Sequence, residues 1–196
     1  MFIQYRYIFW ILFLCCINPA HAEVFYGGAS LGISDANDAC NLKFFEGSCD
    51  NRDTAWKIFG GLYFMPGFAV EGSYLKLGEY SSEGELISNV FVSDKTKFEG
   101  FNVSAVGYLP VHQQIALFGK AGLIFWEMES NTTENNIKTQ FKDDGASLSL
   151  GGGAAYSFTE NLGFRAEWEH FHNLANDTPS ETNLDLFSVG VTFSTL

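Results

Sequence analysis

Residues 115–126 read IALFGKAGLIFW, and the spacing of their side chains decides the fold class. Every second residue of this stretch is apolar or small, whereas Lys120 lies among the residues between them. A period of two residues is typical of a β-strand whose two faces lie in different surroundings. The alternation recurs at 101–109, 148–158 and 162–169, so we expect a protein built of strands.

Eight segments carry this alternation and are predicted to be strands: 24–34, 54–65, 67–78, 97–110, 114–128, 145–158, 162–172 and 184–195. They match the ~9–11 residues that a tilted membrane-crossing strand needs. Short connections alternate with longer polar loops, which are expected at 35–53, 79–96, 129–144 and 173–183. This arrangement is typical of outer-membrane barrels. We therefore predict an all-β fold, an eight-stranded antiparallel transmembrane β-barrel with up-and-down meander topology.

Composition excludes several other classes of protein. The chain has 196 residues and a formal net charge of −12, with only 11 Lys and Arg against 23 Asp and Glu. Nucleic acid is therefore an unsuitable partner, because Lys and Arg carry phosphate binding. Aromatic residues make up 16% of the chain, which excludes intrinsic disorder.

Six charged residues lie on the parity opposite to the apolar one and indicate what fills the barrel. They are Lys57, Glu71, Lys120, Arg165, Glu167 and Glu169. An eight-stranded barrel is only wide enough inside for side chains. An apolar exterior then indicates lipid outside, with a lumen plugged by polar side chains. A soluble periplasmic β-barrel binding protein remains the alternative, since such barrels are polar outside.

Aromatic residues near the predicted strand ends support the membrane interpretation, because outer-membrane barrels carry aromatic girdles. They are Phe25, Trp56, Phe64, Phe68, Tyr74, Trp168 and Phe193.

The first 22 residues are predicted to be a cleaved signal peptide. Arg6 precedes the apolar run 7–17, and residues 20–22 read AHA, an A-x-A-like cleavage site. Cleavage between Ala22 and Glu23 would leave 23–196 as a single barrel domain. Cys40 and Cys49 remain in that domain, and we expect them to form a disulfide in an oxidising compartment.

Several segments, in this order, resemble OmpA-like transmembrane barrels: FYGGASLG at 25–32, FGGLYFMP at 59–66, GGAAYSFT at 152–159, FRAEW at 164–168 and SVGVTF at 188–193. The resemblance implies a barrel of the porin family in a Gram-negative cell envelope, with an interior salt-bridge network in which Glu71 pairs with Arg165. A second Lys–Glu pair of the family would fall on Val106 and Ala155, so both of its partners are absent.

The expected function is structural, with display of surface loops for membrane integrity, adhesion or ligand binding. Expected partners are outer-membrane lipid and lipopolysaccharide, divalent cations at the acidic loops, and a host or surface ligand. We expect a monomer without cofactor, metal or catalytic activity.

A lipid A-modifying, deacylase-like outer-membrane enzyme is the alternative function. Similar enzymes place a His-x-Ser dyad near the seventh strand. Here His170 could act as the base, but His172 stands where the serine would be, so the nucleophile is missing. A metal site at His170 and His172 is a further alternative, since both lie on one face of a strand, but two such ligands two residues apart are common by chance.

Overall fold

The structure is a computed structural model that describes residues 25–36, 46–86, 90–134, 137–174 and 182–195. Nine strands make up these residues: β1 (Phe25–Ala36), β2 (Glu46–Asp50), β3 (Arg52–Met65), β4 (Phe68–Leu86), β5 (Val90–His112), β6 (Ile115–Glu134), β7 (Ile137–Ser157), β8 (Leu162–Leu174) and β9 (Thr182–Ser194). Within the described ranges, no helix is long and apolar enough to cross a membrane.

Eight of these strands close into an antiparallel ring. Each of them pairs with its neighbour in the chain, β3 following β1, and the first and last strands then pair with each other. At that seam Tyr26 lies opposite Ser194, and Ala36 lies opposite Leu184. The predicted eight-stranded barrel is confirmed. Closure leaves the ring itself without an unpaired edge.

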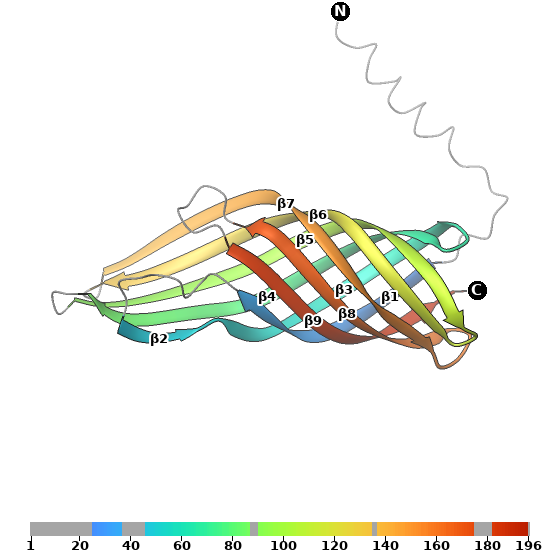
Figure 1. The fold of residues 1–196 in the computed structure, drawn as a ribbon. Helices are drawn as coiled ribbons and strands as arrows, with labels where there is room; N and C mark the ends of the chain where they lie inside the picture. The colour runs from blue at the N-terminus through green and yellow to red at the C-terminus, as the bar shows by residue number, and fades with distance from the viewer. Residues whose placement is uncertain (1–24, 37–45, 87–89, 135–136, 175–181, 196) are drawn as a thin grey trace, which may run out of the picture.

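The two ends of the barrel differ in the length of their connections (Figure 1). Three short turns lie at one end, where the Thr195 amide also donates a 2.8 Å hydrogen bond to the Phe25 carbonyl. At the other end, β4, β5, β6 and β7 continue well past the ends of β1, β8 and β9. We call the end with the short turns the turn end and the end with the extended strands the hairpin end. Outer-membrane barrels have their short turns on the periplasmic side.

The loops predicted at 79–96 and 129–144 are wrong over most of their length, because these residues continue the strands. β4 runs to Leu86 and pairs with β5 from Val90 onward, and β6 and β7 are paired up to 134 and 137. Part of the predicted loop 35–53 is likewise β2 and the start of β3. The prediction failed because polar sequence was taken to mean loop. Strands that lie in water can pair through their backbone hydrogen bonds without an apolar outer face. Opposite charges on neighbouring strands, such as Lys97 and Glu79, also favour their pairing.

A bulge in β4 marks the point where this extension begins. Gly78 has a φ of +98°, in the region that favours glycine. A Cβ atom there would lie 2.7 Å from Cβ of Asp53. The Asp53 carboxylate accepts 2.6 Å hydrogen bonds from the amides of Thr54 and Glu79. Beyond the bulge, β2 continues the line of β3 along β4.

Candidate functional site

The barrel lumen holds a cluster of six charged side chains, which we call the ionic layer. It consists of Lys57 on β3, Glu71 on β4, Lys120 on β6, and Arg165, Glu167 and Glu169 on β8. Each of the six side chains is at most 3% exposed. Three cations face three anions, so the layer is neutral, as buried charges in a narrow lumen require.

Contacts within the ionic layer join strands from opposite sides of the ring. Arg165 Nη1 lies 2.6 Å from Glu71 Oε2, and Lys57 Nζ lies 2.7 Å from Glu167 Oε2. Lys120 Nζ lies 2.5 Å from Glu167 Oε1 and also contacts Glu169, which is bound by Lys57 as well. The structure thus brings together all six residues that the sequence placed on the inward parity. Charge-assisted hydrogen bonds of this kind fix the strands in register across the lumen.

Aromatic side chains enclose the ionic layer toward the turn end. The Arg165 guanidinium lies between the rings of Phe59 and Phe118, 4.8 and 4.2 Å from their centroids. Such cation–π contacts add to the salt bridges in a desolvated site. Nearer the turns, three tyrosines pack ring against ring, and we call them the tyrosine layer: Tyr26, Tyr63 and Tyr108.

The tyrosine layer is joined to the ionic layer by the Tyr26 hydroxyl, which donates a 2.9 Å hydrogen bond to Glu71. Val106 is buried in the apolar cluster at this end, and Ala155 packs against that cluster. These are the two positions where the second ion pair of the resembled family would fall, and apolar packing occupies them here.

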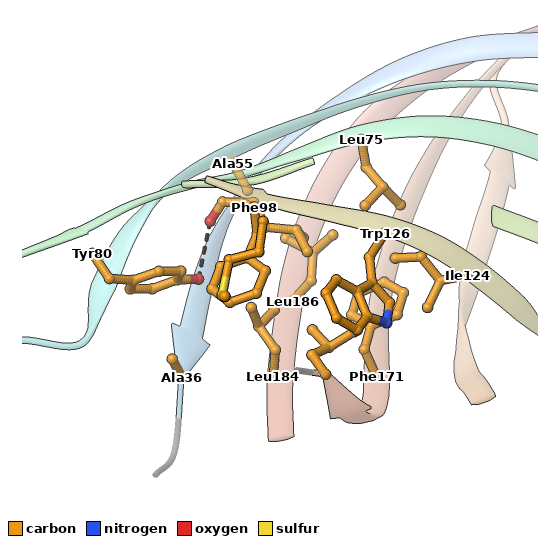
Figure 2. Close-up of a cluster of buried hydrophobic side chains, with 13 residues drawn as sticks. Ala36, Ala55, Leu75, Tyr80, Phe98, Ile124, Trp126, Phe171, Leu184 and Leu186 are labelled. Atoms are coloured by element: carbon orange, nitrogen blue, oxygen red, sulfur yellow. Dashed lines mark hydrogen bonds between the residues drawn. The ribbon is translucent and has the colours of Figure 1, made fainter. Parts of the chain in front are cut away.

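The hairpin half of the lumen is filled by apolar side chains, which corrects the prediction of a polar filling throughout. We call this cluster the apolar layer: Ala36, Ala55, Leu75, Leu77, Tyr80, Phe98, Ile124, Trp126, Met128, Phe171, Leu174, Leu184 and Leu186. These side chains come from every strand of the ring except β7, and Figure 2 shows them gathered together. Its few polar atoms are paired: the Tyr80 hydroxyl donates to the Leu77 carbonyl, and the Trp126 indole donates to Ser147.

The apolar layer could have been found from the sequence. Along β4, the inward residues change from Glu71 and Ser73 to Leu75 and Leu77. Along β6, they change from Lys120 to Ile124 and Trp126. Along both strands the inward residues are therefore polar toward the turn end and apolar toward the hairpin end. This change is hidden when all the inward residues of a strand are considered together.

The outward face of the barrel is apolar toward the turn end and becomes polar near the hairpin end, where the lumen becomes apolar. Near the hairpin end it carries ion pairs that we call the outer rim: Arg52 with Asp35 at 2.7 Å, Lys76 with Glu99 at 3.4 Å, and Lys142 with Glu127 and Glu129 at 3.8 Å. Toward the turn end the same face is apolar, with exposed Leu31, Ile58, Val103, Leu117, Leu123, Val189 and Val191. Charges on a lipid-facing surface are costly near the membrane centre, so the outer rim marks where lipid ends.

Aromatic residues with polar tips lie just below the outer rim. The Tyr74 hydroxyl donates to Glu99 Oε2 at 2.9 Å, and the Trp168 indole donates to Asp185 Oδ1 at 3.0 Å. Amphipathic rings of this kind are enriched where a membrane meets water. The sequence analysis predicted that Tyr74 lies near the end of a strand. It lies within β4 instead, because that strand continues beyond the membrane boundary.

His170 and His172 lie on the outward side of β8, with their ring centroids 6.2 Å apart. His170 Nδ1 lies 2.9 Å from Asp185 Oδ1, so this imidazole has an acidic partner. In the described ranges, no group of three or more His, Cys, Asp or Glu side chains could hold a metal ion. Divalent-cation binding by the acidic loops stays a prediction.

Two predictions concern residues outside the described ranges. The cleavage site between Ala22 and Glu23 lies entirely there, as does Cys40. Cys49 lies in β2, opposite Ser82 of β4, and its predicted disulfide with Cys40 stays a prediction.

Sequence comparison identifies the family of this barrel. The profile of the OmpA-like transmembrane domain matches residues 20–195. The chain belongs to this family. It is an outer-membrane β-barrel, and the resemblance found in its strand motifs is confirmed. A comparison with curated protein sequences finds no match.

Solved structures with the same fold are small outer-membrane barrels. Neisserial surface protein A superposes with a TM-score of 0.56 at 13% identity, over 86% of this chain and 96% of the other. Ail, the attachment invasion locus protein of Yersinia pestis, gives 0.51 at 13% identity, over 88% and 97%. The N-terminal barrel domain of Pseudomonas aeruginosa OprF gives 0.50 at 16% identity, over 88% and 97%. At these identities the likeness concerns the fold alone.

Proposed function

We propose that this OmpA-like barrel is a non-enzymatic anchor that holds an adhesive or ligand-binding surface outside the outer membrane. The observation that carries the proposal is the continuation of β4 to β7 beyond the outer rim as a paired sheet. A barrel that only crossed the membrane would need no strands beyond its polar boundary. Elements that carry recognition on such scaffolds lie at the loop end.

The extension has an edge suited to recognition. β7 pairs with β6 from Ile137 onward, but its pairing with β8 begins only at Ser149. Among the described residues, the stretch 137–148 therefore has β6 on one side and no paired strand on the other. A sheet edge of this kind can accept an extended segment of a partner through backbone hydrogen bonds.

Charge favours a basic partner over an anionic polysaccharide. Acidic residues outnumber basic ones along the edge and the β6 residues beside it: Glu127, Glu129, Asp143 and Asp144 against Lys138 and Lys142, whose ammonium lies 3.8 Å from both glutamates. The net charge of −12 acts in the same direction. Ail has been crystallised with a heparin analogue, sucrose octasulfate. The acidic surface here favours the opposite ligand chemistry.

The lumen supports an anchor rather than a channel. Its tyrosine, ionic and apolar layers leave a recess of about 100 Å³ beside Tyr26, Tyr63 and Arg165 at the turn end. The enzyme alternative lacks support, because His172 stands in the place of the nucleophile that would pair with His170. Lipid A from cells that overexpress the protein should keep its acylation pattern in mass spectrometry, and a deacylated product that His170→Ala abolishes would contradict this.

Deletion of 130–141, rejoined by an Asn-Gly turn, tests the adhesive surface. The deletion removes the outer part of the free edge, 137–141, with the β6 residues that pair with it, and leaves the barrel below the outer rim intact. We expect cells that express the shortened protein to lose binding to immobilised lysine-rich protein, while full-length protein supports it. A heat-modifiable gel shift shows that both barrels fold. Immobilised heparin is the charge control, and cells that bind heparin better than the basic protein, or bind equally with either variant, would overturn the proposal.

A further inference from the structure

A trough of about 540 Å³ lies on the outward face of the barrel, across β5, β6 and β7. Its floor consists of small residues: Ala105 and Gly107 on β5, and Gly119 and Ala121 on β6. The floor residues lie directly opposite one another, Ala105 beside Ala121 and Gly107 beside Gly119. The trough is therefore one continuous groove that runs across the strands on the outside of the barrel.

The two ends of the trough differ in polarity. Phe68, the first residue of β4 after the turn, lies at one end, whereas Trp168 and His170 of β8 lie at the other. Because the strands of such barrels are tilted, this line of register climbs from the turn end toward the outer rim. Leucines border it on both sides, with Leu117 at 46% and Leu123 at 49% exposure.

Packing within the barrel does not explain the glycines of the floor. A Cβ atom on Gly119 would meet nothing closer than a backbone oxygen at 4.0 Å. By contrast, a Cβ atom on Gly122 or Gly153 would lie 2.1 Å from a backbone oxygen. A glycine within a strand weakens it relative to alanine, and it often marks a close approach by a ligand.

We propose that the trough binds one fatty acyl chain of lipopolysaccharide, with the polar end of the lipid beside His170. The trough lies in the apolar band that faces lipid, so acyl chains are its natural medium. Its polar end lies at the outer rim, which places the headgroup in the outer leaflet, where lipopolysaccharide resides. This inference rests on the orientation given under Proposed function, with hairpins outward, and not on adhesion.

The environment of His170 fits a polar headgroup. Its Nδ1 is held by Asp185, and among the described residues no hydrogen bond engages Nε2. With Nδ1 held by the carboxylate, Nε2 is the ring atom left to meet a polar group of the lipid headgroup. His172, exposed and two residues further along the same face, adds a second imidazole at this end.

A second copy of the chain fits the trough less well. A two-fold contact brings the same patch of both copies together. Two troughs facing each other would enclose an unfilled space, whereas close packing requires a convex partner. A flexible acyl chain supplies that shape.

Native mass spectrometry of the refolded full-length mature barrel, incubated in detergent with lipid A, tests the site. Gly119→Leu fills the trough without a clash at its Cβ. We expect it to lower lipid A retention roughly tenfold, which corresponds to about 1.4 kcal/mol. Gly60→Leu is the matched control, because Gly60 is also outward and its Cβ would lie 3.7 Å from the nearest atom. It should retain lipid A like the unchanged protein, and the gel shift verifies folding of both.

Four results would overturn the proposal. They are equal retention by Gly119→Leu and the unchanged barrel, an equal loss in Gly60→Leu, retention of phosphatidylethanolamine as strong as that of lipid A, and a dimer mass that Gly119→Leu abolishes. The assay contains no surface ligand, so a failure here is separate from a failure of the adhesion experiment.

Discussion

Arg165 and Glu71 face each other across the lumen from β8 and β4, 94 residues apart in the chain, with Nη1 2.6 Å from Oε2. The pair belongs to a layer in which three cations balance three anions. Removing one member leaves a buried charge without its partner, which is strongly destabilising, whereas removing a matched pair restores neutrality.

We expect Glu71→Ala to lower the free energy of unfolding by roughly 3–5 kcal/mol, because Arg165 and Lys120 both lose an anion. The double variant Glu71→Ala with Arg165→Met should recover part of that loss. Urea unfolding followed by gel shift measures both. Lys142→Ala is the control, since exposed pairs contribute about 0–1 kcal/mol. Additive effects of the two changes would show that the residues do not interact.

Phe171→Ala should destabilise the barrel by roughly 3–5 kcal/mol, because it opens a cavity in the apolar layer that neighbouring strands cannot collapse to fill. Phe171 is fully buried, whereas Phe187 on β9 is 59% exposed on the outward face. Phe187→Ala should cost clearly less, because lipid can fill the space it leaves. Urea titration in the same lipid compares them, and equal costs would contradict a packed lumen.

The filled lumen should conduct no large, steady current in a planar bilayer. Eight strands leave room for side chains and little else, and three layers occupy that room. Single-channel recording of the refolded protein measures this. A stable porin-like conductance that persists across preparations would contradict the layered filling.

Cleavage after Ala22 should give a mature protein that begins at Glu23 in the outer membrane. The expectation follows from the basic, apolar and A-x-A order of 1–22. Intact-mass measurement of the membrane fraction tests it. A mass that retains 1–22, or recovery of the protein only from the soluble periplasm, would refute it.

Cys40 and Cys49 should be joined in the exported protein. The closed segment is short, so its chain-entropy contribution should be modest, roughly 2–3 kcal/mol. The barrel should keep its gel shift when Cys40→Ser and Cys49→Ser are combined, because the closed ring holds the fold. Alkylation of non-reduced protein is the measurement, and two free thiols would disprove the bond.

The sequence by itself determined the strand architecture and the contents of the ionic layer. A period of two residues is a local property, so stretches such as 115–126 define a strand and its inward side without knowledge of the fold. Because charged residues avoid lipid, Glu71, Lys120 and Arg165 had to point inward once the exterior was apolar.

Only the tertiary structure decided which charges meet and what fills the rest of the lumen. Lys57 binds Glu167, 110 residues away, because β1 and β9 close the ring and fix the height of every strand. The apolar layer and the extended hairpins were missed for one physical reason. Beyond the membrane boundary water replaces lipid outside the barrel, so there the barrel is apolar inside and polar outside. Along a single strand, the residues of one parity therefore change from polar to apolar while continuing to point inward.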